Sequence, residues 1–288
     1  MNRIAMFVVF LMVAVVINGC AFFKKEATVP PVGANWSYSG LTSPEHWHQL
    51  DAKNKLCDKG FQQSPIDIME RDVEETKKLK KMEINYHPSF FSLENNGHTI
   101  EANPVTSGNK ILIDGTSYAL QQFHFHIPSE HQFKGKAFDM EMHLVHKNQA
   151  GNLAVIAVFM TVSENDNEPF LELFQHLPIE ETKKDVPMKY AIDLNSVLPL
   201  KKFAYRYPGS LTTPPCSEGV TWIIMKQPIF LSGEQLVEFR NIIHHNARPI
   251  QLRYWRRIFA EPGTKDMTVE TPPTADGQSI DSSPSAAE

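Results

Sequence analysis

The sequence predicts a mostly β domain with a few short surface helices. Segments rich in Val, Ile, Phe, Tyr and Thr recur between residues 90 and 229, and this composition is typical of strands. Only two segments have helical signals. The 288 residues include 20 prolines and 14 glycines, which mark frequent turns between short elements.

The individual elements follow from local composition. Strands are expected over residues 90–102, 117–127, 137–147, 152–162, 189–198, 202–207 and 219–229. One helix is expected over residues 164–177. A second is expected over residues 236–243, because Ser232 and Gln235 have the spacing of a capping box just before an apolar run.

The N-terminal end has the composition of an export signal. Arg3 precedes an apolar run over residues 4–17, which is too short for a comfortable membrane span. The segment resembles a bacterial lipoprotein signal over residues 1–19, cleaved before a lipidated Cys20, with residues 20–34 as tether. Ala21 resembles the outer-membrane sorting pattern, so we expect a periplasmic protein anchored to that membrane. An uncleaved signal anchor is the alternative, and it also exports the domain.

The C-terminal end is expected to be disordered. Residues 262–288 have few large apolar side chains and many Ser, Thr, Pro and Asp, so they cannot offset their chain entropy by burial. No linker-like composition divides residues 35–261, which we take as one domain. The chain has a net charge of -5 and no basic stripe, and this argues against nucleic acid as a partner.

The cysteine count favours one disulfide. If Cys20 carries lipid, Cys57 and Cys216 remain as a pair in an oxidising compartment. A bond between them would close a long loop, which stabilises a fold by roughly 5 kcal/mol in the chain-entropy model and usually by less in practice. Two buried free thiols are the alternative.

Five of the twelve histidines fall between residues 124 and 146. Because side chains alternate along a strand, His124 and His126 are expected on one face, with phenylalanines on the other. His143 and His146 have opposite parity, so only one of them can join that face. Three imidazoles would leave a fourth position of a metal open, which is the pattern of a catalytic zinc site. Satisfied core or surface histidines are the alternative.

Nine stretches of the chain point to one family. They are WSY (36–38), PEHWHQL (44–50), QSPIDI (63–68), NNGH (95–98), QFHFHIPSEH (122–131), EMHLVH (141–146), LAVIAVF (153–159), GSLTTPPCSEGVTW (209–222) and NARPIQ (246–251). In this order they resemble the α-class carbonic anhydrases over nearly all of residues 35–261. The resemblance implies a large, twisted, mostly antiparallel sheet of ten strands with short surface helices.

The resemblance also implies a role for each clustered histidine. The implied ligands of a Zn²⁺ cofactor are His124, His126 and His143. His131 and His146 match histidines that form hydrogen bonds within the scaffold. Gln122 and Glu141 match residues that orient two of the ligand imidazoles.

Further matches imply the catalytic groups. Thr212 matches a threonine whose hydroxyl donates to Glu130 and accepts from a zinc-bound hydroxide, and its N–H can meet a developing anionic oxygen. His98 matches the proton shuttle, for which an imidazole with an ordinary pKa of about 6.5 is suited. Tyr38 and Asn96 match residues that order the water between zinc and shuttle.

The same matches imply an apolar resting place for carbon dioxide. Its wall would comprise Val145, Val155, Leu211, Val220 and Trp222, with Thr213 beside them. Cys57 and Cys216 match the disulfide of bacterial and secreted members. Glu101 stands where the family usually has an amide. Its carboxylate would either raise the pKa of the shuttle or disturb the water chain, unless it points into solvent.

The expected function is the reversible hydration of carbon dioxide to bicarbonate and a proton by a zinc-bound hydroxide. A catalytically silent binding domain on the surface is the alternative, but such domains usually lack a ligand histidine. Hydrolysis of small esters is a possible side activity, whereas a metalloprotease is disfavoured because no HExxH pair occurs. The expected partners are carbon dioxide, bicarbonate and a membrane through the lipid. The sequence leaves open whether the protein forms a homodimer.

Overall fold

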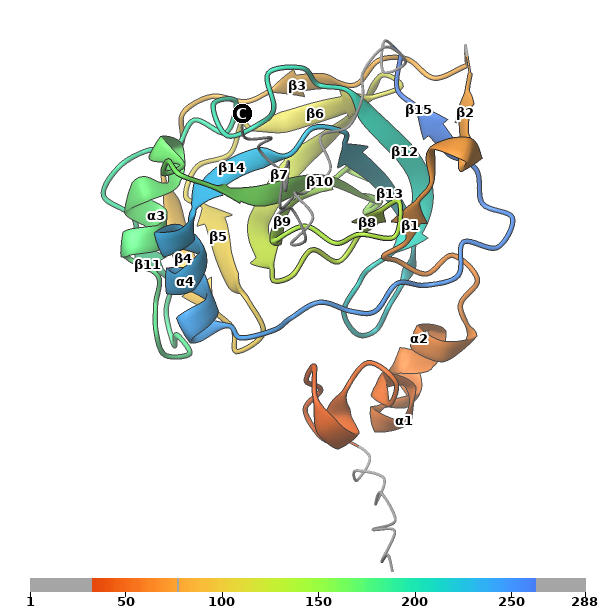
Figure 1. Ribbon diagram of the computed structural model, residues 1–288, viewed down its shortest axis with the longest axis horizontal. Coiled ribbons are helices and arrows are strands. Elements are labelled where there is room, and N and C mark those ends of the chain that lie inside the picture. Colours follow the sequence, from red (N-terminus) through yellow and green to blue (C-terminus); the bar gives the residue numbers. More distant parts are fainter. Residues whose placement is uncertain (1–32, 77, 263–288) are drawn as a thin grey trace, which may run out of the picture.

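The computed structural model describes residues 33–262 apart from residue 77, and a large twisted sheet dominates it (Figure 1). The expected export signal, Cys20 and residues 263–288 of the expected tail lie outside these residues. Within the described part of the chain, no helix is both long enough and apolar enough to cross a membrane.

The strands and helices are short, as the many turn residues predict. The large sheet comprises β2 (Val73–Glu75), β3 (Glu83–Asn85), β4 (Phe91–Asn95), β5 (Ile100–Pro104), β6 (Lys110–Ile113), β7 (Thr116–His126), β9 (Met140–Lys147), β10 (Leu153–Ser163), β11 (Val186–Pro187), β12 (Ala204–Ser210), β13 (Glu218–Met225), β14 (Ile229–Ser232) and β15 (Ile258–Ala260). A second, two-stranded sheet pairs β1 (Asp67–Ile68) with β8 (Gln132–Phe133). The α-helices are α1 (Trp47–Leu50), α2 (Leu56–Lys59), α3 (Leu171–Gln175) and α4 (Gly233–Ile242).

Ten strands form one continuous path through the large sheet, so the expected fold class is confirmed. Their order is β11-β4-β5-β7-β9-β10-β13-β12-β15-β2, and β14, β3 and β6 pair beside this path. Most neighbours are antiparallel, including β7 with β9 and β9 with β10. The exceptions in this sheet are β10, which pairs parallel with β13 and β14, and β15, which pairs parallel with β2.

Two predicted strands differ in the structure. The strand expected over residues 90–102 is an antiparallel pair, β4 and β5, joined by a turn in which the N–H of Asn96 donates to the carbonyl of Thr99. The strand expected over residues 189–198 is not formed. Residues 189–198 form turns, with a single bridge between Ile192 and Ser89. The N–H groups of Asn195 and Ser196 donate to the side chain and the carbonyl of Asp193, so local polar contacts replace a sheet ladder. Four apolar residues of the segment are nevertheless buried in the core: Ile192, Leu194, Val197 and Leu198. The segment thus has the burial of a strand without its pairing.

The helix predictions are correct in place but not always in extent. Ser232 caps α4, and both hydrogen bonds of the predicted capping box with Gln235 are present. The other expected helix is shorter than residues 164–177, because a 3-10 turn over Glu168–Phe170 leads into only five residues of α3. The helices α3 and α4 lie against each other, and α4 also contacts β14 and β10 (Figure 1).

The two faces of β7 and β9 have different surroundings, and this places the site. Phe123 and Phe125 of β7 and Leu144 of β9 point into the larger hydrophobic core. The alternate residues point to the opposite face, where His124 of β7 and His143 of β9 are cross-strand partners. A hydrophobic face on one side therefore holds a polar row in place on the other.

Candidate metal centre

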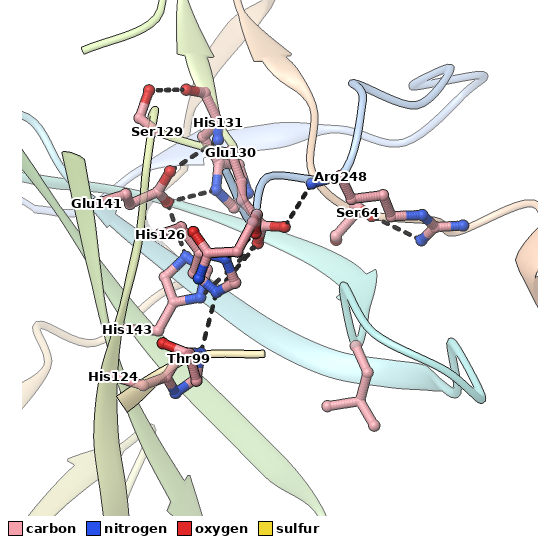
Figure 2. Close-up of polar contacts among 12 residues, drawn as sticks. Ser64, Thr99, His124, His126, Ser129, Glu130, His131, Glu141, His143 and Arg248 are labelled. Atoms are coloured by element: carbon pink, nitrogen blue, oxygen red, sulfur yellow. Dashed lines mark hydrogen bonds and ion pairs between the residues drawn. The ribbon is translucent and has the colours of Figure 1, made fainter. Parts of the chain in front are cut away.

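Three imidazoles converge on the cavity side of the sheet. His124 and His126 lie two residues apart on β7, and His143 lies opposite His124 on β9. The Nε2 atoms of His124 and His126 are 3.1 Å apart, and the three potential ligand atoms all lie within 4.8 Å of one another. Figure 2 shows the three rings turned toward a common point.

Each of these rings is held through its other nitrogen. His124 Nδ1 donates to Gln122 Oε1 at 2.7 Å, and His143 Nε2 donates to Glu141 Oε1 at 3.0 Å. His126 Nδ1 donates to the main-chain carbonyl of Asn246 at 2.7 Å. Because an acceptor fixes the proton on one nitrogen, the lone pair of the other is available to a metal.

The surroundings favour the neutral form of His124 and His126, which is the form that binds metal. Burial lowers the pKa of His124 well below its ordinary value, and the neighbouring imidazoles add to this effect. Burial also lowers the pKa of His126, against the opposing charge of Glu130. For Glu141, burial favours a higher pKa, but His131 and His143 hold it well below the usual range.

The other two histidines of the cluster belong to the scaffold. His131 Nδ1 and Nε2 lie 2.6 Å from Glu141 Oε1 and Tyr207 Oη respectively, so both its nitrogens are engaged within the protein. His146 Nε2 lies 2.8 Å from Tyr86 Oη on the core side of β9. Neither ring lines the cavity.

Glu130 differs from the arrangement that the resemblance implies. Its Oε1 accepts from the main-chain N–H of Arg248 at 2.9 Å. Its Oε2 has no hydrogen-bond partner among the described residues and lies 3.5 Å from His126 Nε2. The expected hydrogen bond from Thr212 is therefore not formed, because this oxygen faces the ligand nitrogens instead.

A cavity of about 170 Å³ opens above the three imidazoles. Besides the imidazoles, the expected residues that line this cavity are Tyr38, Asn96, His98, Gln122, Val145, Val155, Leu211, Thr212, Thr213 and Trp222. Val220 is not part of this lining, although it is buried in the same hydrophobic cluster as Val155 and Trp222. The cavity thus has one apolar wall and one polar wall.

The polar wall includes the unusual carboxylate. Glu101 lines the cavity, so the alternative that it points into solvent is excluded. Its Oε1 accepts from Asn96 Nδ2 at 2.9 Å. Burial raises the pKa of Glu101, and the nearby Glu94 adds to this effect. Asn96 in turn accepts from the main-chain N–H groups of His98 and Thr99, which fixes the turn that carries His98.

His98 lies at the rim, with its ring stacked on Trp36. The ring centroids are 3.6 Å apart and the planes differ by 12°. Burial lowers the pKa of His98, and the charge that opposes this shift belongs to Glu181. The effect of Glu101 on the shuttle or on the water chain stays a prediction.

The predicted disulfide between Cys57 and Cys216 is present. Cys216 N–H donates to the carbonyl of Thr213 at 2.8 Å, so the bond holds the loop that carries the Thr212–Thr213 pair. The same region buries Arg248, whose guanidinium donates to the carbonyls of Cys57 and Ser64. The disulfide therefore supports one wall of the cavity.

Several contributing residues were not identified from sequence. Trp36 stacks on His98, a contact that its sequence motif does not indicate. Asn246 orients His126 through a main-chain oxygen, and no residue type indicates such a contact. Its side chain also accepts from the N–H of Ile127 at 2.7 Å, which ties the C-terminal segment to the end of β7.

The donor set fits a single zinc ion. Three neutral imidazoles with free lone pairs are typical zinc ligands, and no fourth protein ligand joins them among the groups that the described residues bring together. The fold and site thus define a mostly β protein with a three-histidine metal centre under a half-apolar cavity.

Comparison with known proteins identifies the family. Residues 42–261 match the family described as eukaryotic-type carbonic anhydrase. The chain belongs to this family, and its enzyme class is carbonic anhydrase.

Individual relatives agree with this assignment. A carbonic anhydrase of Klebsiella pneumoniae is 46% identical over 220 residues, which cover 76% of this chain and 87% of the relative. One of Neisseria gonorrhoeae is 37% identical over 239 residues, covering 83% and 92% respectively. The solved structure of an α-carbonic anhydrase from Thermovibrio ammonificans with the inhibitor sulfanilamide has a TM-score of 0.75 and 39% identity, covering 79% of this chain and 99% of that one.

Proposed function

We propose that the chain catalyses the reversible hydration of carbon dioxide to bicarbonate and a proton, with Zn²⁺ held by His124, His126 and His143. One observation carries the proposal: each imidazole has one nitrogen fixed by a protein acceptor, which leaves three lone pairs directed at one point. Zinc, when bound there, would acidify a water ligand and so supply a nucleophile near neutral pH, a role for which carbonic anhydrase is itself the standard example.

The apolar wall receives the substrate. Val145, Leu211 and Trp222 line the cavity next to the imidazoles. Carbon dioxide is uncharged and has little need of hydrogen bonds, so an apolar wall suits it better than it suits bicarbonate. The wall thus favours departure of the charged product.

Thr212 and Glu130 orient the reacting groups. Thr212 lines the cavity, and Glu130 Oε2 is buried without a hydrogen-bond partner in the described part of the chain. That oxygen can accept from a hydroxyl group in the site, and such a contact would fix the direction of the remaining lone pairs. The main-chain N–H of Thr212 can meet a developing negative charge on the substrate.

His98 moves the proton. Its half-buried ring lies at the rim of the cavity, where the polar wall of Tyr38 and Asn96 ends. An imidazole can accept a proton from the site and release it to buffer near neutral pH. Burial lowers the pKa of His98, and the charge of Glu181 opposes this shift.

The proposed location is the periplasm, with lipid on Cys20 holding the chain at the outer membrane. The apolar run and Cys20 support export, and the Cys57–Cys216 disulfide suits an oxidising compartment. Incorporation of labelled fatty acid, abolished by Cys20→Ser, tests the lipid. Incorporation that persists in this variant would refute it.

The decisive test of function is stopped-flow hydration of carbon dioxide with a pH indicator. Enzyme purified with its disulfide intact should hydrate rapidly, lose this activity when a strong chelator removes the metal, and regain it with zinc. A folded, zinc-loaded enzyme that does not hydrate carbon dioxide would overturn the proposal and favour a silent binding domain.

A further inference from the structure

A second hollow opens on the surface beside the cavity, and His98 lies in the wall between the two. His98 and Tyr38 line both the cavity and the hollow. The hollow is also lined by His244 and His245, which follow the last residue of α4. Both of these side chains are exposed, so they can exchange protons with solvent. Three imidazoles therefore surround one surface hollow that borders the active-site cavity.

One nitrogen atom of His244, Nε2, is free to accept a proton. Its Nδ1 lies 3.0 Å from the main-chain carbonyl of Arg240. A carbonyl only accepts, so Nδ1 carries the proton and Nε2 keeps its lone pair. This position is one residue beyond the C-terminal cap of α4, where the helix dipole favours a positive charge.

His245 lies on the side of the hollow that faces the cavity. Its ring meets the ring of Tyr38 edge-on, with centroids 6.4 Å apart. Tyr38 extends into the cavity, and burial raises its pKa well above the ordinary value, so the phenol stays neutral and does not compete for the proton. Tyr38 is shared by the cavity and the hollow, and the imidazole of His245 is the basic group beside it.

An acidic group stabilises positive charge at the same place. Gly97 lines the hollow, and a Cβ at this position would lie only 2.6 Å from Glu181 Oε1, so the carboxylate rests against the turn that carries His98. Gly97 has a φ of +81°, a conformation that glycine adopts without strain. The charged and titratable groups that face His98 are therefore Glu181 from its loop, His244 and His245 from the end of α4, and Glu101 from β5 across the cavity.

We propose that His244 and His245 form a second relay for the proton, which receives it from His98 in the hollow and releases it to buffer. The inference rests on the proposed function, in which His98 takes the proton from the site. Protonated His98 gives its N–H proton to the lone pair of His245, directly or through water, and returns to the neutral form. The new imidazolium passes the proton to His244 or to a buffer base. The relay would give the proton on His98 a second route to buffer.

The test uses zinc-loaded, full-length enzyme in which both residues are replaced, H244Q/H245Q. In weak buffer kcat should fall about two- to fivefold while kcat/KM for carbon dioxide stays unchanged, because only proton release is impaired. Strong imidazole buffer should restore kcat. A merely structural role would change kcat/KM or thermal stability instead.

A matched control exists on α3. His176 is exposed, and its Nδ1 lies 2.9 Å from the carbonyl of Glu172, four residues earlier, as in His244. It does not line the hollow. His176→Gln should therefore leave kcat unchanged in weak buffer. An equal loss in this control would attribute the effect to surface charge and overturn the relay.

A double-mutant cycle with His98→Ala completes the test. If the relay acts through His98, H244Q/H245Q should have no further effect in the His98→Ala background. Independent, multiplicative losses would overturn the proposal, as would an unchanged kcat in the parent background. If His98→Ala slows turnover but H244Q/H245Q does not, the relay fails while the proposed function stands. A wild-type enzyme without hydration activity would instead refute the function itself.

Discussion

The histidines between residues 124 and 146 occupy two different regions, and the difference shows how one residue type acquires two roles. In the cavity, the ring of His124 has one nitrogen held by Gln122 and the other facing its neighbours. In the scaffold, the ring of His131 has both nitrogens engaged, by Glu141 and Tyr207. A metal needs a free lone pair, so only the first arrangement can bind one. Hydrogen-bond partners, and not proximity in sequence, separate ligand from structural support.

The largest expected effect follows from removing a cavity imidazole. His124→Ala should lose zinc and reduce hydration by more than about a hundredfold, which exceeds the 10- to 100-fold cost typical of outer partners. The phenylalanine face of β7 remains intact, so the variant should unfold at nearly the same temperature as the wild-type protein without metal. Metal content by mass spectrometry and stopped-flow rates test this. Full zinc occupancy and full activity would remove His124 from the ligand set.

A smaller effect is expected when the ring of His124 stays in place but loses its hydrogen-bond acceptor. Gln122→Ala deletes the acceptor of His124 Nδ1, so the ring loses its fixed orientation and zinc affinity should fall about 10- to 100-fold. Competition with a chromophoric chelator measures this. Gln121→Ala is the matched control, because Gln121 is exposed and its amide donates only to the carbonyl of Ala119. Equal losses in both variants would contradict the orienting role.

The scaffold region predicts an effect on stability and not on zinc. Burial lowers the pKa of His146 to about 3 in the folded protein, against about 6.5 for an unperturbed imidazole. The unfolded chain therefore binds the proton first as pH falls. This residue should contribute a loss of about 1.4 kcal/mol in unfolding free energy for each pH unit between these values.

His146→Gln should flatten this acid slope, since the amide does not titrate and can still bond with Tyr86. Denaturant unfolding of metal-free protein between pH 6.5 and 4.5 measures the slope without a contribution from zinc release. His176→Gln, which removes an exposed imidazole, should leave the slope as it is. Equal slopes in His146→Gln and the wild type would refute the assignment.

The smallest effect concerns His98 at the rim of the cavity. Glu181 opposes the effect of burial on His98, so Glu181→Gln should lower the pKa of His98. The shift should diminish at high salt, because Glu181 is exposed and its charge is screened. Titration of the ring by NMR measures the pKa. Glu180→Gln is the control, and an equal shift in that variant would indicate a general charge effect.

Sequence reasoning succeeded where a local pattern has a single structural meaning. The alternation in residues 122–126 placed Gln122, His124 and His126 on one face, and the capping box located the start of α4. It failed over residues 189–198, where apolar composition indicated a strand but side-chain contacts of Asp193 stabilise turns. An apolar composition indicates that a segment is buried, but it does not show that the segment pairs in a sheet.

The site shows the same limit. Val220 matched the apolar wall by sequence, yet it does not line the cavity, and the charge that opposes the effect of burial on the pKa of His98 belongs to Glu181. Neither result could be predicted, because each depends on how separate segments meet. Glu181 lies 83 residues after His98 in the chain, and only the folded loop brings its charge to the turn.

The sequence by itself determined the mostly β class, the shared face of His124 and His126, and the cysteine pair, because each follows from strand periodicity or from counting. Only the tertiary structure decided which nitrogen of each imidazole is free, which carboxylate adjusts the proton affinity of His98, and that a hollow with two more imidazoles borders the cavity. These properties depend on distances between residues far apart in the chain, and electrostatic and hydrogen-bond energies fall steeply with distance.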